Sequence, residues 1–512
     1  MIGVPRLADF VKAYDVRGTV PDQLSPAVAQ ALGAAFAEVV AVPDGSAGIV
    51  IGHDMRPSSP ELSAAFAAGV TSRGVDVTMI GLCSTDGLYY ASGALDLPGA
   101  MFTASHNPAQ YNGIKLCRSA ARPVGQDSGL AEIRDLAQWM LDGGSGLAQP
   151  VGGAGTVTTR DLLGDYATFL RGLVDLSASR PLKVVVDAGN GMGGHTVPAV
   201  LGTGAGLPAL PLEVVPLYFE LDGTFPNHEA NPLDPANLVD LQAAVREHGA
   251  DIGLAFDGDA DRCFVVDADG EPVSPSAVTG LVAVREIARA RAGGDTDVAI
   301  VHNVISSAAV REVVLESDAT PVRTRVGHSF IKAEMARAGA VFGGEHSAHY
   351  YFRDFWFADT GMLAALHVLS ALGEQERPLS ELCASYERYV ASGEINSTVT
   401  DQAAVVEQVR AWAQVRGAAT DELDGLTVTS PEGQSPTWWF NVRASNTEPL
   451  LRLNVEAADR ETMQDVRDEL LALIRSDATG TDGPTGSTAS STTSSTTSST
   501  TSSTTKDAGD AS

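Results

Sequence analysis

The chain has 512 residues, of which 44% are hydrophobic and 19% charged, and its formal net charge at pH 7 is −30. A chain of this length is too long for one hydrophobic core, so we expect several domains. The negative charge argues against binding to nucleic acid or to an anionic membrane through bulk electrostatics, so a site for an anion must be built from specific residues.

Cysteine usage and the N-terminal segment indicate where the protein works. The four cysteines are scattered singly, with no CxxC pair, so we expect them to be reduced and chemically inert: Cys83, Cys117, Cys263 and Cys383. The N-terminus lacks a charged region followed by an apolar core, and no run of about 18 apolar residues occurs. We therefore predict a soluble, cytoplasmic protein.

Strand and helix patterns alternate along the chain. Residues 25–42 carry apolar side chains at helical spacing after a capping Ser25, an apolar strand follows at residues 47–52, and a second helix is predicted at residues 60–73. The alternation returns in apolar strands at residues 182–187, 252–256 and 298–301, the last before a helix at residues 306–315. Repeated βα units predict layered α/β domains with mixed, largely parallel sheets.

Segments rich in Gly or Pro indicate where these domains end. They lie near residues 143–155, after residues 267–270 and near residues 376–379. The expected domains therefore cover residues 1–155, 156–271, 272–376 and 377–477. From about residue 478 the chain consists largely of Ser and Thr, without the apolar side chains needed to build a core, so we predict a disordered tail at residues 478–512.

An acidic segment directly after a predicted strand is a candidate metal site. Asp257, Asp259 and Asp261 alternate with small residues, so a tight loop can aim the three carboxylates at one point, and hard oxygen donors suit Mg²⁺. A calcium EF-hand is disfavoured, because Arg262 and Ala268 stand where that loop needs Gly and Glu. A solvated acidic turn is the alternative, although Arg262 adds a cation suited to phosphate oxygens.

Ser105 is a candidate nucleophile. It lies between Ala104 and His106, and the turn forced by Asn107-Pro108 leads us to expect an exposed hydroxyl. No Gly-x-Ser-x-Gly pattern surrounds it, so acyl transfer is unsupported. If Ser105 carries a phosphoryl group, a divalent cation and Lys115 would offset its charge and stabilise in-line transfer. A structural serine in a capping turn remains the alternative.

Two later polar segments suit a phosphate and a sugar. One combines a guanidinium with hydroxyl, amide and backbone donors that can hold a non-reacting phosphate: Arg443, Ser445, Asn446 and Thr447. The other places polar side chains at alternating positions, from which they could project together toward sugar hydroxyls: Glu345, Ser347 and His349. Each segment alone could equally be a plain surface turn.

Together these segments closely resemble the active-site loops of the α-D-phosphohexomutases, and among them those of bacterial phosphomannomutases. The matching loops occur in the family's order: residues 103–108, 257–262, 344–349 and 443–449. Three more motifs match, at residues 12–18, 186–191 and 222–228. The resemblance covers about residues 10–475 and implies four domains around a central cleft. Three would be α/β domains and the smaller C-terminal one α+β, and each would supply one loop.

The resemblance also implies a role for each matching residue. Ser105 would be the phosphoserine, and its phosphate would bind Mg²⁺ together with Asp257, Asp259 and Asp261. Lys115 and His349 would be acid/base candidates, with Arg17 and His106 beside them. The substrate-binding residues would be Arg262, His328, Glu345, Ser347, Arg443, Ser445, Asn446 and Thr447. Ala348 departs from the Gly often found at its position and stiffens the backbone there without removing a contact.

The implied reaction is an isomerisation of a hexose phosphate. Phosphorylated Ser105 would phosphorylate the free end of the sugar, the hexose 1,6-bisphosphate would turn around, and the other phosphate would return to Ser105. The motifs resemble phosphomannomutase more than phosphoglucosamine mutase, with phosphoglucomutase or dual specificity as the alternative. A sugar-phosphate phosphatase and a non-catalytic sensor are the rivals from other classes. We expect Mg²⁺, hexose 1,6-bisphosphate as activator, and a monomer or weak dimer.

Overall fold

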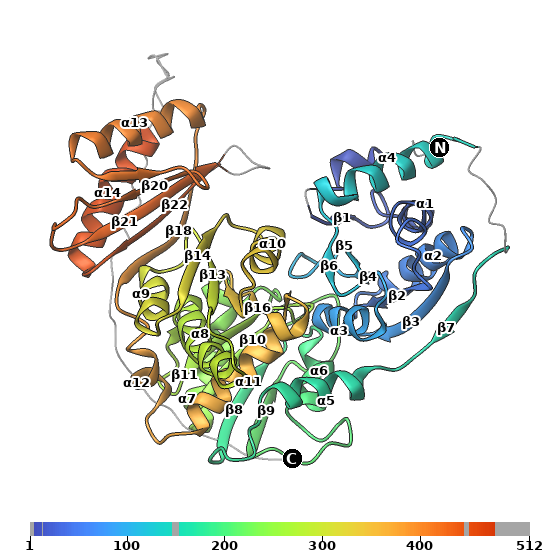
Figure 1. Ribbon diagram of the computed structural model, residues 1–512, viewed down its shortest axis with the longest axis horizontal. Coiled ribbons are helices and arrows are strands. Elements are labelled where there is room, and N and C mark those ends of the chain that lie inside the picture. The colour runs from blue at the N-terminus through green and yellow to red at the C-terminus, as the bar shows by residue number, and fades with distance from the viewer. Residues whose placement is uncertain (1–4, 13, 146–152, 445–449, 477–512) are drawn as a thin grey trace, which may run out of the picture.

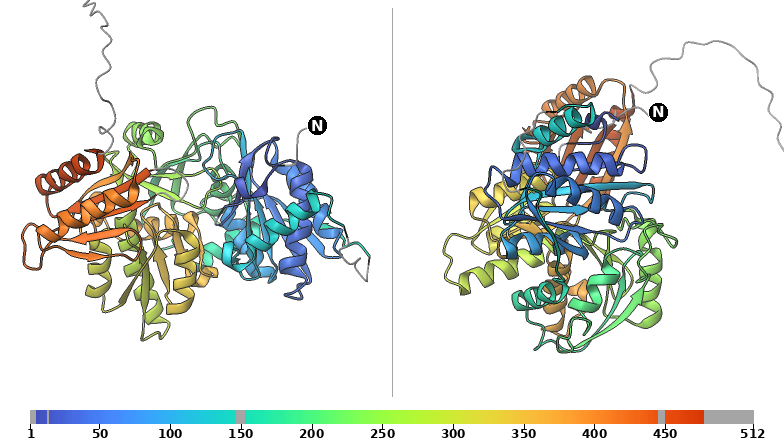
Figure 2. Two further views of the ribbon diagram at one scale, coloured as in Figure 1. Left: turned by 90° about the horizontal axis from the view of Figure 1, so that it is seen from above. Right: turned by 90° about the vertical axis from the view of Figure 1, so that its right-hand side faces the viewer.

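The computed structural model describes residues 5–12, 14–145, 153–444 and 450–476. They form four domains, each with its own β-sheet (Figure 1). The first domain, in blue, and the fourth, in orange and red, lie at opposite ends of the molecule, with the second and third domains between them (Figures 1 and 2). Within these residues no helix is both long enough and apolar enough to cross a membrane.

The first domain has a mixed sheet in the order β1-β5-β4-β2-β3-β7, with β6 paired to β5. Its strands are β1 (Val16–Thr19), β2 (Gly48–His53), β3 (Asp76–Leu82), β4 (Gly99–Phe102), β5 (Tyr111–Arg118), β6 (Arg122–Pro123) and β7 (Val157–Thr159). Its helices are α1 (Pro26–Phe36), α2 (Ser59–Thr71), α3 (Thr85–Leu95) and α4 (Leu130–Leu141). Because strand side chains alternate, Ile49 and Ile51 of β2 pack with α1 and α2, whereas Val50 packs with α3.

The predicted elements of this domain form with small shifts in their ends. Ser25 caps α1 by accepting from the Val28 amide at 3.4 Å, with Pro26 in the first turn. The helix predicted to reach residue 42 is α-helical only to Phe36 and continues as a π-helical turn, Ala37–Ala41. The capping Ser25 and the following Pro26 therefore predict where the helix begins. The apolar spacing predicts its end less accurately.

The second domain has the sheet order β12-β11-β10-β8-β9 and the third has β14-β13-β15-β16-β17. The second contains α5 (Leu163–Leu173), β8 (Leu182–Asp187), α6 (Gly193–Val200), β9 (Leu212–Leu217), α7 (Val239–His248), β10 (Ile252–Phe256), β11 (Cys263–Asp267) and β12 (Pro272–Val273). The third contains α8 (Pro275–Ala292), β13 (Ala299–Asn303), α9 (Ala308–Glu316), β14 (Thr320–Thr324), α10 (His328–Ala338), β15 (Phe342–Gly344), β16 (Tyr350–Phe352), β17 (Ala358–Asp359) and α11 (Gly361–Gly373). In both sheets, parallel central strands carry antiparallel hairpins.

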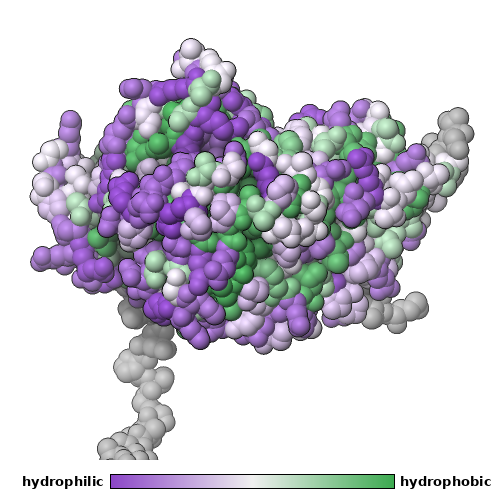
Figure 3. Space-filling model, turned by 90° about the horizontal axis from the view of Figure 1, so that it is seen from below, coloured by the Kyte–Doolittle hydropathy of each residue, from purple (hydrophilic) through white to green (hydrophobic). Residues whose placement is uncertain are grey.

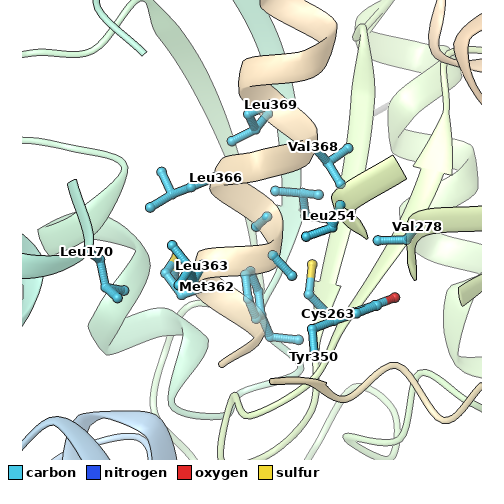
Figure 4. Packing of buried hydrophobic residues seen from close by; sticks show 14 of the residues in the cluster. Leu170, Leu254, Cys263, Val278, Tyr350, Met362, Leu363, Leu366, Val368 and Leu369 are labelled. Atoms are coloured by element: carbon cyan, nitrogen blue, oxygen red, sulfur yellow. The ribbon is translucent and has the colours of Figure 1, made fainter. Parts of the chain in front are cut away.

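One hydrophobic core runs through the second and third domains. Helix α11 lies between Leu170 of α5 on one side and Leu254 and Cys263 of the second-domain strands on the other (Figure 4). The same cluster includes Leu88 of α3, so the first domain is attached to it as well. All four cysteines are unpaired and buried, in line with the sequence.

The fourth domain has a separate core under an antiparallel sheet in the order β18-β22-β21-β20-β19. After α12 (Leu379–Cys383), it contains β18 (Val390–Thr398), α13 (Gln402–Val415), β19 (Ala419–Asp421), β20 (Leu426–Thr429), β21 (Trp438–Ala444), β22 (Leu450–Ala457) and α14 (Arg460–Ser476). Both of its long helices cover one face of the sheet. The four-domain architecture, with three α/β domains and a smaller α+β domain, matches the prediction.

The surface is mixed in character. Seen from below, hydrophilic residues cover much of the face, and hydrophobic ones gather in patches across its middle (Figure 3).

Candidate active site

The candidate nucleophile lies in the loop between β4 and β5. Ser105 Oγ is 2.9 Å from Asp257 Oδ2 and 3.2 Å from His106 Nδ1, and the Ser105 amide donates to Thr103 Oγ1 at 2.9 Å. The residue has a φ of 52°, in the left-handed region that costs energy for a residue with a side chain. The surrounding structure must therefore hold this loop in shape.

The prediction that the Ser105 hydroxyl is exposed is wrong. The residue is only 4% exposed, because the acidic loop of the second domain packs against it. A Cβ atom on Gly258 would lie 2.4 Å from the Ser105 carbonyl oxygen, so glycine is needed for this close approach. The Asn107-Pro108 turn bends the chain as predicted, but a local turn contains no information about a second domain that covers it.

The acidic loop forms the hairpin between β10 and β11. Candidate ligand oxygens of Asp257, Asp259 and Asp261 all lie within 4.8 Å of one another, and all three residues are buried. Lys115 Nζ donates to Asp259 Oδ2 at 2.7 Å and to Asp261 Oδ2 at 2.5 Å. The carboxylates thus converge, as the alternating pattern predicts, and a lysine from the first domain reaches them.

The free oxygens of this cluster suit a hard divalent cation. Among the described residues, Asp259 Oδ1 and Asp261 Oδ1 are buried without a hydrogen-bond partner, whereas the other oxygen of each carboxylate accepts from Lys115. A buried, unpartnered carboxylate oxygen is costly, and coordination to a cation such as Mg²⁺ removes that cost. The donor set therefore fits a magnesium ion.

Burial and neighbouring charges shift the pKa values of the cluster in different directions. Burial raises the pKa of Asp257 to about 7, although Arg262 opposes the shift. Burial also acts against ionised Asp259, but the Lys115 ammonium outweighs it and lowers the pKa of that carboxyl. The pKa of Lys115 is raised well above its usual value, since Asp259 and Asp261 overcome its desolvation. Lys115 is therefore held as a cation.

Three more of the predicted residues surround Ser105. Arg17 donates to Asn107 Oδ1 at 2.7 Å and to Asp15 Oδ2 at 2.7 Å. Arg262 contacts Asp257 Oδ2 through Nε and Nη2, at 3.0 and 2.9 Å, and its Nη2 lies 2.6 Å from His106 Nδ1. Burial and the Arg262 guanidinium lower the pKa of His106 well below its usual value.

The candidate sugar-binding residues lie in the hairpin between β15 and β16. Ser347 Oγ is 2.9 Å from His349 Nδ1, and His349 Nε2 is 3.6 Å from Asp261 Oδ1, so this loop reaches the acidic cluster. The Glu345 carboxylate is buried and accepts from the Tyr351 hydroxyl at 2.5 Å and from Asn303 Nδ2 at 3.2 Å.

His328 begins helix α10. Its ring centroid lies 5.0 Å from that of Tyr14. Burial, with Lys332 nearby, lowers the pKa of His328 to about 3, so its imidazole is neutral.

Arg443 lies at the end of β21 and lines a cavity of about 670 Å³ between the first, third and fourth domains. Its guanidinium donates to Asn454 Oδ1 at 3.1 Å and pairs with Glu394. Ser445, Asn446 and Thr447 lie outside the described residues. Further cations from three domains line the same cavity: Lys12, Arg134, Arg325 and Arg452.

Family matches run along almost the whole chain. Residues 9–138, 164–270 and 276–389 match domains I, II and III of phosphoglucomutase/phosphomannomutase, all described as alpha/beta/alpha. Residues 394–473 match its C-terminal domain. The chain belongs to the phosphoglucomutase/phosphomannomutase family. Enzymes of this family are intramolecular phosphotransferases, a class of isomerase, so the chain is an enzyme of that class.

Relatives of this phosphohexomutase span it nearly end to end. A protein of Xanthomonas campestris described as phosphohexose mutases is 39% identical over 467 residues, covering 91% of this chain and 98% of the relative. A phosphomannomutase of Escherichia coli is 38% identical over 470 residues, with the same coverage. The crystal structure of a phosphoglucomutase/phosphomannomutase family protein from Burkholderia thailandensis has a TM-score of 0.79 at 30% identity and covers 92% of this chain and 98% of that one.

Some residues that line this candidate site were not predicted from the sequence. Thr85 of α3 donates its hydroxyl to Asp259 Oδ2 at 2.6 Å and its amide to the Asp259 carbonyl at 3.0 Å. Arg325 and Arg452 join Arg443 at the cavity. The two arginines could have been predicted, because they lie close in sequence to Gly327-His328 and to the predicted phosphate loop. Thr85 could not have been predicted in this way, because its contact with Asp259 joins two domains.

Proposed function

We propose that this enzyme is a phosphomannomutase that interconverts mannose 6-phosphate and mannose 1-phosphate. The observation that carries the proposal is the 2.9 Å contact between Ser105 Oγ and Asp257 Oδ2, which joins a serine nucleophile to a cluster of three carboxylates. The choice of mannose is supported by the relatives named phosphomannomutase, among them those of Escherichia coli and Salmonella typhimurium.

Phosphorylated Ser105 is the phosphoryl donor in the first half-reaction. The bond between Ser105 Oγ and phosphorus breaks, the bond to a sugar hydroxyl oxygen forms, and the proton of that hydroxyl passes to a base. Lys115, Arg17 and Arg262 place cations around the transferring group and offset its charge. Asp257, Asp259 and Asp261 would hold Mg²⁺, which supplies further charge neutralisation when bound.

The second half-reaction runs in reverse after the hexose 1,6-bisphosphate has turned around. The phosphate at the other end then returns to Ser105 and leaves the isomeric monophosphate. His349, which lies beside Asp261, and Lys115 are the candidates for the acid and the base. Glu345, Ser347 and His328 would bind the sugar.

The cavity lined by Arg443 would hold the phosphate that is not reacting. Its cations come from three domains, so either end of the substrate meets a positive surface there. We assign Ser445, Asn446 and Thr447 to the same phosphate from the sequence. Closure of the cleft would exclude water, which would otherwise hydrolyse the phosphoserine.

Mg²⁺ is the expected metal and hexose 1,6-bisphosphate the expected activator, and the state in solution is a monomer or a weak dimer. A mutase that accepts glucose phosphate as well is the second candidate, favoured by the relative described as phosphohexose mutases.

A coupled assay with Mg²⁺ and a trace of hexose 1,6-bisphosphate tests the proposal. It compares mannose 1-phosphate, glucose 1-phosphate and glucosamine 1-phosphate at equal concentrations. Preference for mannose 1-phosphate supports phosphomannomutase, and equal turnover of glucose 1-phosphate supports dual specificity. Release of inorganic phosphate without isomer would instead indicate a phosphatase, and binding without turnover a sensor. Ser105→Ala should abolish turnover while binding of the sugar phosphate persists; unchanged turnover would exclude Ser105 as the nucleophile.

A further inference from the structure

Arg56, in the loop that follows β2, is fully buried beneath the Ser105 loop. A guanidinium has five N–H donors, and all five are engaged here. Nε donates to Asp54 Oδ2 at 3.2 Å, Nη1 to the carbonyls of Pro108 and Tyr111 at 2.9 Å each, and Nη2 to those of Ser105 and Asn107 at 2.9 and 2.6 Å. One side chain thus holds four carbonyls of the segment that contains the nucleophile.

The counterion of Arg56 is itself held in place. Asp54 Oδ1 accepts from the Ser59 hydroxyl at 2.6 Å and from the Arg56 amide at 3.0 Å. A buried ion pair has a large desolvation cost, which its hydrogen bonds must offset. The bonds that satisfy Arg56 are those that define the path of residues 105–111, including the left-handed backbone of Ser105 at φ 52°.

The second domain closes over Arg56 from the other side. A Cβ atom on Gly223 would lie 2.7 Å from Arg56 Cα, and the Phe225 ring centroid lies 5.1 Å from Arg56 Cζ. Both residues belong to the motif at residues 222–228. Asn190, from the motif at residues 186–191, holds that loop by accepting from the Asp222 amide at 3.0 Å and from Asn227 Nδ2 at 2.8 Å. These contacts connect two motifs of the sequence that the reaction itself leaves without a role.

We propose that Arg56 is a positioning residue for phosphoryl transfer. It sets the backbone of the Ser105 loop against the acidic loop and is braced by Gly223 and Phe225 of the second domain. It acts through Ser105 and does not touch the substrate. The inference rests on the proposed phosphoryl transfer at Ser105.

Two substitutions at this position test the inference. Arg56→Lys keeps the charge, but all of its hydrogen-bond donors are on one nitrogen. Arg56→Met removes both the charge and the donors. The readouts are the single-turnover rate of phosphoryl transfer from glucose 1,6-bisphosphate to the dephosphorylated enzyme and the Kd of mannose 1-phosphate. Because a displacement of about 1 Å can cost roughly 100-fold in rate, we expect losses of about 100-fold for Arg56→Met and about 10-fold for Arg56→Lys. The Kd should change by less than about threefold, since uniform binding is untouched.

Arg171→Met is the matched control. Arg171 also donates to three backbone carbonyls, those of Val200, Gly202 and Pro208, but within the second domain and away from Ser105. It should lower Tm as the Arg56 variants do, yet leave the transfer rate within about twofold, because no bond to the serine loop is lost. A rate loss in Arg171→Met as large as that in Arg56→Lys would make the Arg56 effect merely structural and would overturn the inference.

Phe225→Leu decides the matter if Arg56→Met does not fold. It removes the ring from the guanidinium but keeps all five of its hydrogen bonds, so a small loss in transfer rate at unchanged Kd is expected. The inference would be overturned if the wild-type enzyme transfers the phosphoryl group normally and the transfer rate of Arg56→Lys lies within about twofold of the wild-type rate. The proposed function would then still stand. A wild-type enzyme that forms no phosphoserine would overturn both.

Discussion

The two ends of the candidate site are built in different ways. At the reacting end, backbone meets backbone across the first and second domains, as between Gly258 and Ser105 and between Gly223 and Arg56. At the phosphate-binding end, Arg443 belongs to a fourth domain that has its own hydrophobic core.

Polar contacts join the fourth domain to the third. The Ala308 amide donates to Glu456 Oε1 at 2.9 Å, the Val326 amide donates to Asp424 Oδ2 at 2.9 Å, and Arg323 pairs with Asp421 at 2.6 Å. Polar contacts between domains with separate cores break more easily than the packing within a shared core. We therefore expect the fourth domain to move relative to the third. The reacting end is therefore rigid, as bond breaking requires. The phosphate-binding end can adjust, as binding a substrate that must turn around requires.

The largest loss of activity should come from an added side-chain atom between the two loops of the reacting end. In Gly258→Ala the added Cβ would lie 2.4 Å from the Ser105 carbonyl oxygen, so the two loops must separate. We expect kcat to fall about 100-fold with little change in KM, because the reacting groups lose their alignment. Gly172→Ala in α5 is the control, since its Cβ would meet nothing within 4 Å. Full activity in Gly258→Ala would show that the close approach is dispensable.

Metal binding at the rigid end should depend on pH. A carboxylate must be deprotonated to bind a cation, and burial raises the pKa of Asp257 to about 7. Mg²⁺ affinity measured by calorimetry should therefore be about tenfold higher at pH 8 than at pH 6. Asp257→Asn should bind Mg²⁺ more weakly and lose this dependence. Affinity that falls as the pH rises would contradict the assigned ligands.

A change at the adjustable end should affect binding more than chemistry. The side chain of Arg325 is half-exposed at the cavity, so Arg325→Ala should raise KM for the hexose phosphate about fivefold and leave kcat nearly unchanged. Steady-state kinetics at several ionic strengths measure both constants. Arg337→Ala, which removes an exposed arginine paired with Glu334, is the control. A fall in kcat at constant KM would place Arg325 at the reacting end instead.

The smallest effect is expected from the C-terminal tail. Truncation after residue 477 removes the Ser- and Thr-rich segment and should change kcat/KM by less than about twofold, because that segment has no large apolar side chains with which to dock on the cleft. The same coupled assay measures it. A large loss would mean that the tail contributes to the site.

Local patterns were enough to predict much of the fold and to single out several residues of the candidate site. The apolar run at residues 182–187 coincides with β8, and the run at residues 252–256 coincides with β10. The acidic loop follows β10 at once, so its three carboxylates converge. The helix predicted to reach residue 42 stays helical to Ala41 but changes to a π-helical turn after Phe36. The exposed Ser105 was wrong, because the burial of that hydroxyl depends on a loop distant in sequence.

The sequence by itself determined the chemistry available to this enzyme: a serine in a tight turn, three aspartates at alternating positions, and motifs whose order identifies a phosphohexomutase. The tertiary structure decided how these groups are held. Arg56 acts on backbone carbonyls, and every residue has one, so no side-chain pattern in residues 105–111 could indicate its target. Thr85 reaches Asp259 only because α3 of the first domain begins against the second domain. Such contacts join segments far apart in the chain and carry no local periodicity, which is why only folding reveals them.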